Sequence, residues 1–447
     1  MQSHGNKKSS NFPDPLASQQ EKSSEGYGTS YAKAIESQWG SLSNQNSLIR
    51  QRNKTFERNR EYANGTQDTT IYKQILTNLD PNNADGSLVN LDYTPVPILP
   101  KFAKIVSNKI LSRDPYPNLE AIDPLSSSEK QQEKNRIKNQ VMLREELLKL
   151  KEMTGGLVLG EDPESLPETM EEAEIFLETN VKTDAEIAAQ IGTNLTLSWS
   201  NFNDGIFRRV VNDLVALGMG VVKRSNDPSY GIREEYVDPI NFIHSYTEDP
   251  GMNDLQYAGH IKRVSISELK RLAGDQFSEE DYQRIAKTIA DRSGYDKGKI
   301  NDTQYDRTLN RTMYGYDEFM VDILDFEFVS TDCIYFEEKE NKYGNSGFFY
   351  EGFSYKEKKN SVFSRTPHKL EIQTVYGGSY ILGCDKLFDY GMKSNVPKNI
   401  HDISKARMSY SSIATNIRRM IPKSLIDGCV GFADMLQITH LKLQQSL

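Results

Sequence analysis

The chain is 447 residues long, 26% of its residues are charged, and its formal net charge is −9 at pH 7. This charge argues against a protein that binds nucleic acid tightly, because such proteins neutralise phosphates with an excess of Lys and Arg. Apolar residues make up only 37%, so we expect much of the chain to be exposed or held against partners. The three cysteines lie too far apart for a zinc motif or a disulfide framework. The sequence contains no run of about eighteen apolar residues, so we do not expect a membrane-spanning helix.

The N-terminal part is polar and then helical. Residues 1–45 are rich in Ser, Gln, Asn and Gly, which predicts a polar arm that becomes ordered only along another molecule. Residues 46–182 should be mainly helical. Within them, Ser47–Asn64 is a basic helix whose cations either face solvent or meet an acidic neighbour or a phosphate. The stretch Glu161–Glu186 holds ten acidic residues and one Lys, which predicts a solvated acidic face or one that receives a basic partner.

The central stretch begins with a capping box, Thr183 to Glu186, which predicts the start of a helix. Bulky apolar residues then recur at steps of three and four, which predicts one continuous amphipathic helix ending at Gly218. These residues are Ile191, Leu195, Trp199, Phe202, Ile206, Val210, Leu214 and Leu217. Strands should follow at residues 221–223, 230–237 and 257–264. We expect helix and strands to share one core within residues 183–312.

Two short helices should follow the strands, opened by Ser265 and Ser278, each with an acidic residue three positions later. Residues 293–313 are polar and predict a linker. From Asp317 the apolar residues alternate with a period of two and then change phase, which predicts a long strand with a bulge.

The C-terminal part is predicted to change from strands to helix. Aromatic stretches at 347–355 and 370–382 predict further strands, which makes residues 313–400 β-rich. In residues 401–447, apolar residues recur at steps of about four, including Ile413, Ile417 and Ile421. We therefore expect this last segment to be helical, with interruptions at a proline and a glycine.

No motif predicts catalysis. The chain has no Gly-rich phosphate loop, no His-Glu-x-x-His zinc motif and no Gly-x-Ser-x-Gly elbow, so we expect no enzyme, no cofactor, and no catalytic or metal-binding residue. His260, in a predicted strand, should be a core or sheet-face residue rather than a base or ligand. One alternative stays open: a nucleic-acid-processing enzyme that binds Mg²⁺ through Asp322, Asp325 and Glu327. The simpler interpretation of these acids is a wetted strand face.

The order of these elements resembles the portal proteins of tailed bacteriophages, and most closely those of crAss-like phages. The segments that carry the resemblance are Asn212–Arg224, Tyr236–Ile243, Ala258–Leu272 and Phe319–Phe336, with further support from Pro95–Leu111 and Ile413–Leu436. None of them is a catalytic signature, and the resemblance lies in their order.

The resemblance implies an α+β, portal-like protomer. Residues 46–182 and 183–312 would form a helix-and-sheet wing, residues 313–400 a β-rich clip-like region, and residues 401–447 a stem-type helical segment. Portal proteins form rings, usually of about twelve copies, at a single capsid vertex, and DNA is packaged and ejected through the ring. The implied partners are further copies of the chain, the major capsid protein, the terminase motor, neck and tail adaptor proteins, and transient non-specific double-stranded DNA, with no membrane. The implied location is the virion, after assembly in the host cytoplasm.

A conduit should hold DNA loosely, since each neutralised phosphate adds affinity and therefore friction; an acidic chain with a few cations meets that need. Arg418, Arg419 and Lys423 lie within about one and a half turns of the predicted last helix and are the candidates for contact with the DNA backbone. Ordinary salt bridges between subunits, or solvation, are the alternative. A different virion structural protein, such as a head-to-tail adaptor or a scaffold, would equally lack catalytic motifs.

Overall fold

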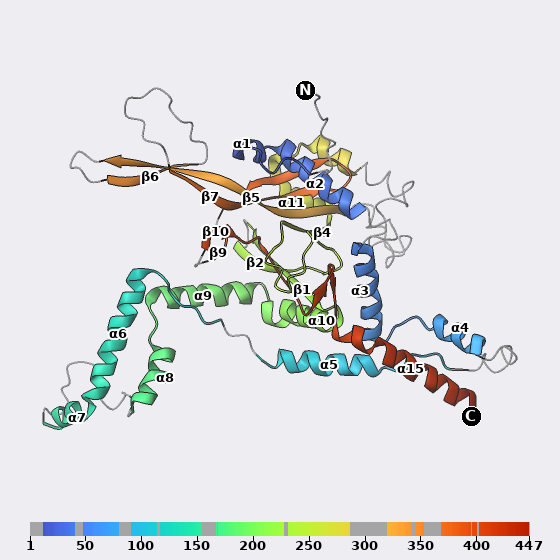
Figure 1. Ribbon diagram of the computed structural model, residues 1–447, viewed down its shortest axis with the longest axis horizontal. Coiled ribbons are helices and arrows are strands. Elements are labelled where there is room, and N and C mark those ends of the chain that lie inside the picture. The colour runs from blue at the N-terminus through green and yellow to red at the C-terminus, as the bar shows by residue number, and fades with distance from the viewer. Residues whose placement is uncertain are drawn as a thin grey trace, which may run out of the picture. The chain divides into compact units, whose positions relative to one another are not determined.

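The computed structural model describes residues 12–40, 48–79, 91–113, 117–153, 167, 169–227, 231–286, 320–340, 346–352, 368–394, 396–399 and 402–446 (Figure 1). The fold class is α+β, as the sequence predicts. The chain divides into two compact units. The first comprises Met1–Ser112, Gly205–Ser229 and Glu234–Leu447, and the second comprises Arg113–Asp204 and Tyr230–Arg233. The linker predicted over 293–313 lies outside the described residues.

Two sheets form the centre of the first unit (Figure 1). The larger sheet has the strand order β3-β4-β5-β7-β8, and β6 pairs with β5 outside this order. Its strands are β3 (Phe242–His244), β4 (Tyr257–Ser265), β5 (Met320–Glu340), β6 (Ser346–Gly352), β7 (His368–Ile381) and β8 (Lys386–Met392). The smaller has the order β11-β1-β2, with β11 (Tyr410–Ala414), β1 (Met219–Asp227) and β2 (Gly231–Tyr236). Strand β4 pairs with β5 from Tyr257↔Phe328 to Ser265↔Met320. The larger sheet therefore joins the two regions predicted as separate, residues 183–312 and 313–400.

Strand β5 has no bulge at the change of phase near Leu324, where one was predicted; a register shift occurs further along, between Tyr335 and Phe336 in its pairing with β6. Its register with β7 is unbroken from Ile323↔Ile381 to Phe336↔His368, so the predicted bulge is wrong. The apparent change of phase arises because each face of this long strand meets two environments. One face is apolar at Val321 and Ile323 and polar at Asp325 and Glu327, while the other is apolar at Leu324, Phe326 and Phe328.

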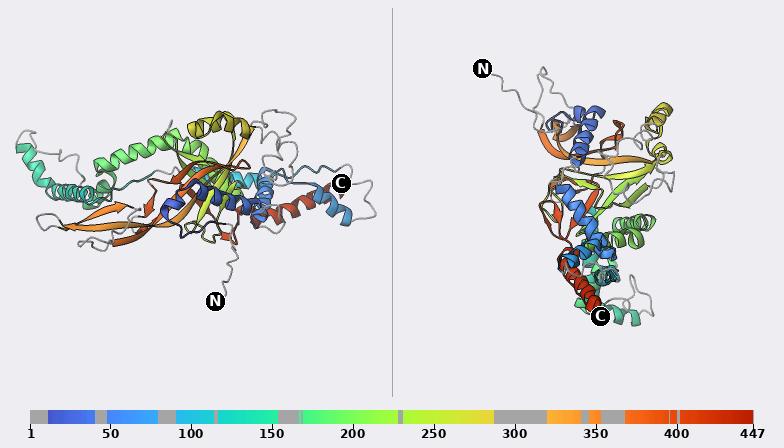
Figure 2. Two further views of the ribbon diagram at one scale, coloured as in Figure 1. Left: turned by 90° about the horizontal axis from the view of Figure 1, so that it is seen from above. Right: turned by 90° about the vertical axis from the view of Figure 1, so that its right-hand side faces the viewer.

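The described part of the N-terminal arm, residues 12–40, folds back onto its own chain, which contradicts the expectation that the arm needs another molecule. Helix α2 (Glu25–Gly40) lies against β7 and β8 (Figures 1 and 2), and the Tyr390 hydroxyl of β8 donates to the carbonyl of Lys22, the last residue of α1 (Gln19–Lys22), at 2.6 Å. The ring of Tyr31 stacks on Phe328 with centroids 3.9 Å apart. Lys22, 2% exposed, donates to Asp332 at 3.0 Å. The composition of residues 1–45 suggests too little apolar surface, but a few aromatic side chains aimed at one sheet suffice to order residues 12–40.

The single long helix predicted from Thr183 to Gly218 is interrupted. Helix α9 (Asp184–Trp199) begins with the predicted capping box, but Asn201 has a φ of 48°, and a π-helical turn (Phe202–Phe207) precedes α10 (Arg208–Ala216). A left-handed residue and a wider turn both rotate the residues that follow, so the apolar positions do not form one stripe. Helix α10 packs on β1, whereas the bulky apolar side chains of α9 are exposed.

The segment from 402 to 424 is not helical, which corrects the prediction for residues 401–447. It forms β10 (Asp402–Ala406), paired with β9 (Lys398–Asn399), then β11, β12 (Ile417–Arg418) and β13 (Ile421–Pro422). Within residues 402–446, the helical part is α15 (Leu425–Ser446). The isoleucine spacing of four imitates a helix, but Tyr410–Ala414 pairs with β1 and gains its burial there.

Each unit contains further helices. In the first unit, α3 (Leu48–Asn64), α4 (Thr70–Leu79) and α5 (Ile98–Leu111) each contact α15. Helix α11 (Ile266–Ala273) begins as predicted, because the Ser265 hydroxyl accepts from the Glu268 N–H, and residues 279–286 are also helical. In the second unit, α6 (Pro124–Met142), α7 (Arg144–Met153) and α8 (Met170–Asn180) precede α9, and α6 packs on α8 through a small core.

The basic residues of helix α3 were predicted to face solvent or to meet an acidic neighbour or a phosphate. Arg58 forms an ion pair with Asp427 at 2.7 Å, and Arg60 forms one with Asp238 at 2.8 Å, so these cations meet acidic neighbours of the same chain.

Arg52 of the same helix is buried instead of paired with an acid: it is 1% exposed and donates to the Phe242 carbonyl at 2.8 Å and to His244 Nε2 at 2.9 Å. His244 Nδ1 lies 2.8 Å from the Ser245 carbonyl and donates to it. Nε2 must therefore stay unprotonated to accept from Arg52.

This contact makes an acid-sensitive stability contribution. Burial, with the nearby Arg52, lowers the pKa of His244 to about 3, whereas an unfolded histidine titrates near 6.5. The contribution is therefore complete above pH 6.5 and is lost as the pH falls toward 3, at about 1.4 kcal/mol per pH unit. Between pH 6.5 and 5 the native chain should lose about 2 kcal/mol more unfolding free energy than His244→Gln, which still accepts from Arg52 but does not titrate. Urea unfolding at both pH values measures this, and equal losses would contradict it.

Candidate functional site: a basic hairpin before α15

The three predicted DNA-contact residues lie on one short hairpin. Strands β12 and β13 pair through Ile417↔Pro422 and Arg418↔Ile421. The two residues between them, Arg419 and Met420, have φ angles of 51° and 62°. Two left-handed residues in succession define the type I′ turn, which normally selects Asn and Gly. A chain that instead places Arg and Met there holds a strained turn with a cation at its tip.

The hairpin separates apolar from basic side chains. Ile417, Met420 and Pro422 are buried, whereas Arg418, Arg419 and Lys423 are exposed. Within the described residues, none of the three cations has an acidic partner at ion-pair distance. The structure thus brings the predicted residues together, but on a turn rather than on a helix.

Close backbone contacts hold the base of the hairpin. The Thr415 N–H donates to the Gly218 carbonyl at 2.9 Å, and the Lys423 N–H donates to the Asn416 carbonyl at 2.7 Å. The Thr415 hydroxyl donates to the Lys423 carbonyl at 2.7 Å. Gly218 has a φ of 76°, and a Cβ placed on it would lie 2.6 Å from the Lys423 carbonyl oxygen. The end of α10 and the hairpin are therefore fixed to each other by backbone atoms.

The start of α15 fixes the other end. The Ser424 hydroxyl accepts from the Asp427 N–H at 3.1 Å, and the Asp427 carboxylate accepts from the Ser424 N–H at 3.0 Å, which together form a capping box. Asn59 of α3 donates to Ser424 Oγ at 3.1 Å, and Arg58 pairs with Asp427. Helix α3 thus sets the direction in which α15 and the preceding Lys423 extend.

One carboxylate lies beside the cations. Glu248 accepts a hydrogen bond from the Tyr246 hydroxyl at 2.6 Å. That bond, the Arg419 backbone N–H, and the charges of Arg418 and Arg419 lower the pKa of Glu248. Glu248 stays ionised and offsets part of the positive charge, so the hairpin is suited to weak contact with phosphates rather than tight binding.

Sequence reasoning missed a buried polar layer between the two sheets of the first unit. Lys223 of β1 forms a close ion pair with Asp325 of β5, and Tyr410 of β11 donates to the Asp325 carbonyl at 3.0 Å. His260 Nδ1 lies 2.8 Å from the Tyr410 hydroxyl, and burial lowers the pKa of His260 to about 3. These partners are far apart in the chain, so no sequence spacing signals them.

The acidic residues of β5, Asp322, Asp325 and Glu327, were predicted to bind Mg²⁺ or to form a wetted strand face. Asp325 and Glu327 are buried, so the expected wetted strand face is wrong for them. Glu327 accepts from the Ser409 N–H and hydroxyl, both at 2.7 Å, while Asp322 lies 3.8 Å from Arg263. Each acid is already engaged by a protein group. Within the part of the chain that the structure describes, no three potential metal ligands gather. His260 is a buried sheet residue, as predicted.

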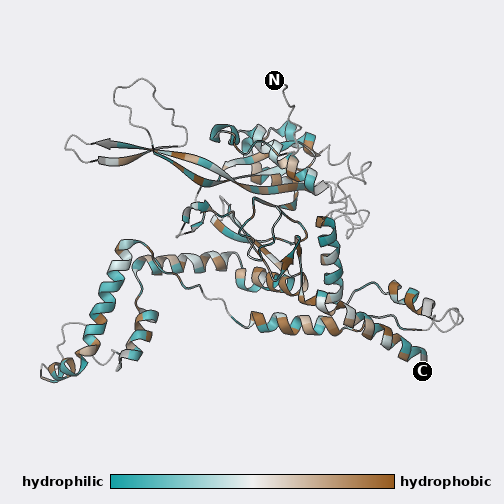
Figure 3. Ribbon diagram, viewed as in Figure 1, coloured by the Kyte–Doolittle hydropathy of each residue, from teal (hydrophilic) through white to brown (hydrophobic). Residues whose placement is uncertain are grey.

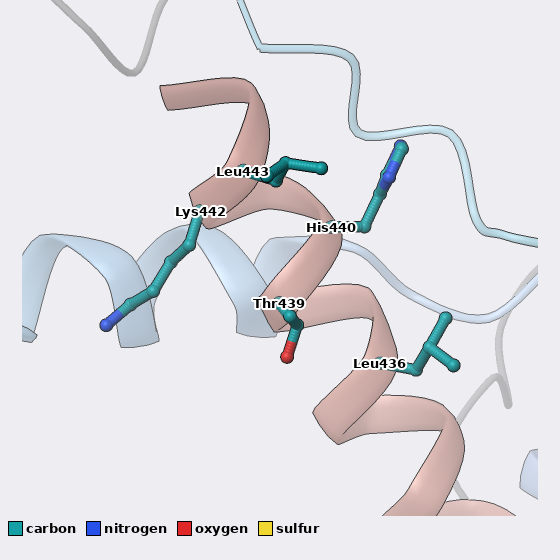
Figure 4. Close-up of a pocket in the computed structure, with 5 residues that line it drawn as sticks. All are labelled: Leu436, Thr439, His440, Lys442 and Leu443. Atoms are coloured by element: carbon teal, nitrogen blue, oxygen red, sulfur yellow. The ribbon is translucent and has the colours of Figure 1, made fainter. Parts of the chain in front are cut away.

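A shallow pocket lies along α15. It is lined by Leu436, Thr439, His440, Lys442 and Leu443. Figure 4 shows Leu436, His440 and Leu443 projecting to one side of the helix, with Lys442 extending away from them. A ligand site usually has several polar groups converging on an enclosed space, and these side chains do not converge. We do not assign a ligand to this pocket.

No model of a known protein family matches the chain, and no curated protein matches its sequence. Among the described helices, none is both long enough and apolar enough to cross a membrane.

Proposed function

We propose that the chain is a portal protein of a tailed bacteriophage, which forms a ring at one capsid vertex and acts as the channel for DNA packaging and ejection. The main observation in support is the order and packing of the four segments that resemble those of portal proteins. Asn212–Arg224 contains the end of α10 and the start of β1, Tyr236–Ile243 leads into β3, and Ala258–Leu272 contains most of β4 and of α11. Phe319–Phe336 contains most of β5, which pairs directly with β4.

Two features of the described residues support this proposal. Large apolar side chains are exposed on several helices, among them Phe102 on α5, Trp199 on α9 and Phe432 on α15. A subunit of a closed ring buries such surface against its neighbours. The channel role is supported by an acidic chain that carries a small, exposed basic hairpin, because loose contact lets a duplex slide. Terminase, neck and tail proteins, and the capsid protein are the partners that a portal would have in the virion.

The experiment is end-on electron microscopy of the purified full chain, together with its mass by light scattering. We expect rings of about twelve copies. A compact monomer at every concentration would overturn the proposal. Rings located away from the capsid vertex in virions would instead favour another structural role, such as a scaffold.

The basic hairpin gives a separate prediction for this function. In phage particles, the triple change Arg418→Ala, Arg419→Ala, Lys423→Ala should shorten the packaged DNA without preventing ring assembly, because exposed cations contribute to phosphate contact but not to the core. Packaged length is measured on DNA extracted from purified heads. The matched control removes three exposed lysines from α5, Lys101, Lys104 and Lys109. Unchanged DNA length in the hairpin variant, or equal shortening in the control, would remove these residues from the channel.

A further inference from the structure

Helix α9 has a composition that is unusual for a helix in water. From Ile187 to Asn203 the chain has no charged residue. Ile187, Ile191, Leu195 and Trp199 follow one another at steps of four and are 44%, 57%, 45% and 64% exposed. Solvated helices normally carry charges on their outer face, so this pattern is typical of a helix that is covered by another polypeptide. Within its own unit, neither α6, α7 nor α8 packs extensively on α9.

Small residues lie beside the bulky stripe. Ala188 and Gly192 are exposed, and a Cβ added to Gly192 would meet nothing within 4 Å. Small side chains on an open helix face let a second helix approach closely and leave room for its bulky side chains. The face of α9 is therefore shaped for a helix with large apolar residues.

Helix α15 exposes a face of that kind. Its exposed large apolar residues are Leu425, Phe432, Met435, Leu436 and Leu443. Figure 3 shows apolar residues along both α9 and α15. Between Asp427 and Lys442 the only charged residue is Asp434, and its carboxylate accepts from Tyr62 and Tyr72 at 2.5 and 2.7 Å. The exposed face of α15 between Asp427 and Lys442 is thus uncharged as well.

We propose that α9 of one copy of the chain docks on the exposed face of α15 of a second copy. The absence of charge from Ile187 to Asn203 disfavours nucleic acid or a charged peptide as the occupant of the exposed stripe of α9, and this chain itself supplies an uncharged, bulky helix face. Each copy carries one face of each kind, so the contact is heterologous and can link copies in sequence around a ring. This inference rests on the proposed ring and names the surfaces that close it.

Cross-linking of the full chain tests the pairing. In a background where Cys333, Cys384 and Cys429 are replaced by Ser, Ile191→Cys is combined with Met435→Cys and treated with a short bismaleimide. We expect a ladder of covalent dimers and larger multimers on denaturing gels. The control pair replaces Ile191→Cys with Gln132→Cys, on the exposed surface of α6, and should stay monomeric. Dimers from Ile191→Cys alone would instead mean that α9 pairs with itself, and a cross-link within one chain would also overturn the proposal.

A second variant uses assembly as its readout. Ile191→Glu with Leu195→Glu should reduce the mass in solution toward that of a monomer while leaving the melting temperature of the monomer unchanged, because both side chains are exposed. Gln132→Glu is the control and should assemble normally. Rings that form with no cross-link, or that survive both charges, would overturn this inference but not the portal assignment. Cross-linked chains that never close into rings would overturn the assignment but not the contact. An uncross-linked monomer at all concentrations would overturn both.

Discussion

Replacing Lys223 with Met should lower the free energy of unfolding by about 3–5 kcal/mol, the usual cost of removing one partner of a buried ion pair. Lys223 is 7% exposed and pairs with the buried Asp325 between the two sheets. Burial alone would raise the pKa of Asp325, but the Lys223 ammonium outweighs it and holds that pKa below its usual range. Without Lys223 the carboxylate keeps only the weaker contact with Lys262, at 3.5 Å. Urea unfolding of the variant and the native chain measures the difference.

Two controls separate the pairing from the loss of a side chain. The double change Lys223→Met with Asp325→Leu should recover most of the stability, because an apolar pair of similar volume leaves no buried charge. Lys270→Met removes a partner of Glu279, and both of those side chains are more than half exposed, so its cost should stay below about 1 kcal/mol. A cost for Lys223→Met no greater than that of Lys270→Met would show that the buried pair does not hold the sheets together.

Gly218→Ala should lower the free energy of unfolding by about 2–5 kcal/mol. The left-handed backbone costs about 1–2 kcal/mol for a residue with a Cβ, and the new methyl group would lie 2.6 Å from the Lys423 carbonyl oxygen, a clash that adds about 1–3 kcal/mol. Thermal unfolding gives the shift. The same clash should displace the basic hairpin, since Thr415 and Lys423 both contact this backbone.

Gly231 provides the matched control for that change. It has the same φ of 76°, but a Cβ there would meet nothing within 4 Å. Gly231→Ala should therefore show only the backbone cost of about 1–2 kcal/mol. If both alanine variants lose the same stability, the close approach between Gly218 and Lys423 has no energetic role.

Local sequence signals predicted local structure well. The N-cap residues Thr183 and Ser265 each begin a helix at the expected position, because each accepts from a backbone N–H three residues later and needs no tertiary context. Periodicity was less reliable. The bulky residues after Thr183 keep a helical spacing through the π-helical turn, since spacing reports residue type and not the backbone angle of Asn201. The spacing of Ile413, Ile417 and Ile421 likewise imitated a helix.

Long-range contacts explain the remaining differences. The buried layer between the sheets depends on residues such as Lys223 and Asp325, which are 102 positions apart, so no sequence window contains both. The sequence identified the three basic residues as candidates for contact with DNA but placed them on a helix and did not predict the hairpin. Its turn holds Arg419 and Met420 where Asn and Gly are usual, and the conventional turn signal is therefore absent.

The contact between Lys22 and Asp332 has a consequence for synthesis on the ribosome. The two residues are 310 positions apart, so at about 5–20 residues per second the N-terminal helices leave the exit tunnel roughly 15 to 60 seconds before their strand exists. During that interval Tyr31 and its aromatic neighbours have no sheet to cover. The N-terminal helices are thus among the last parts of the polypeptide to reach their final place, and a chaperone that shields them would raise the yield of folded chains.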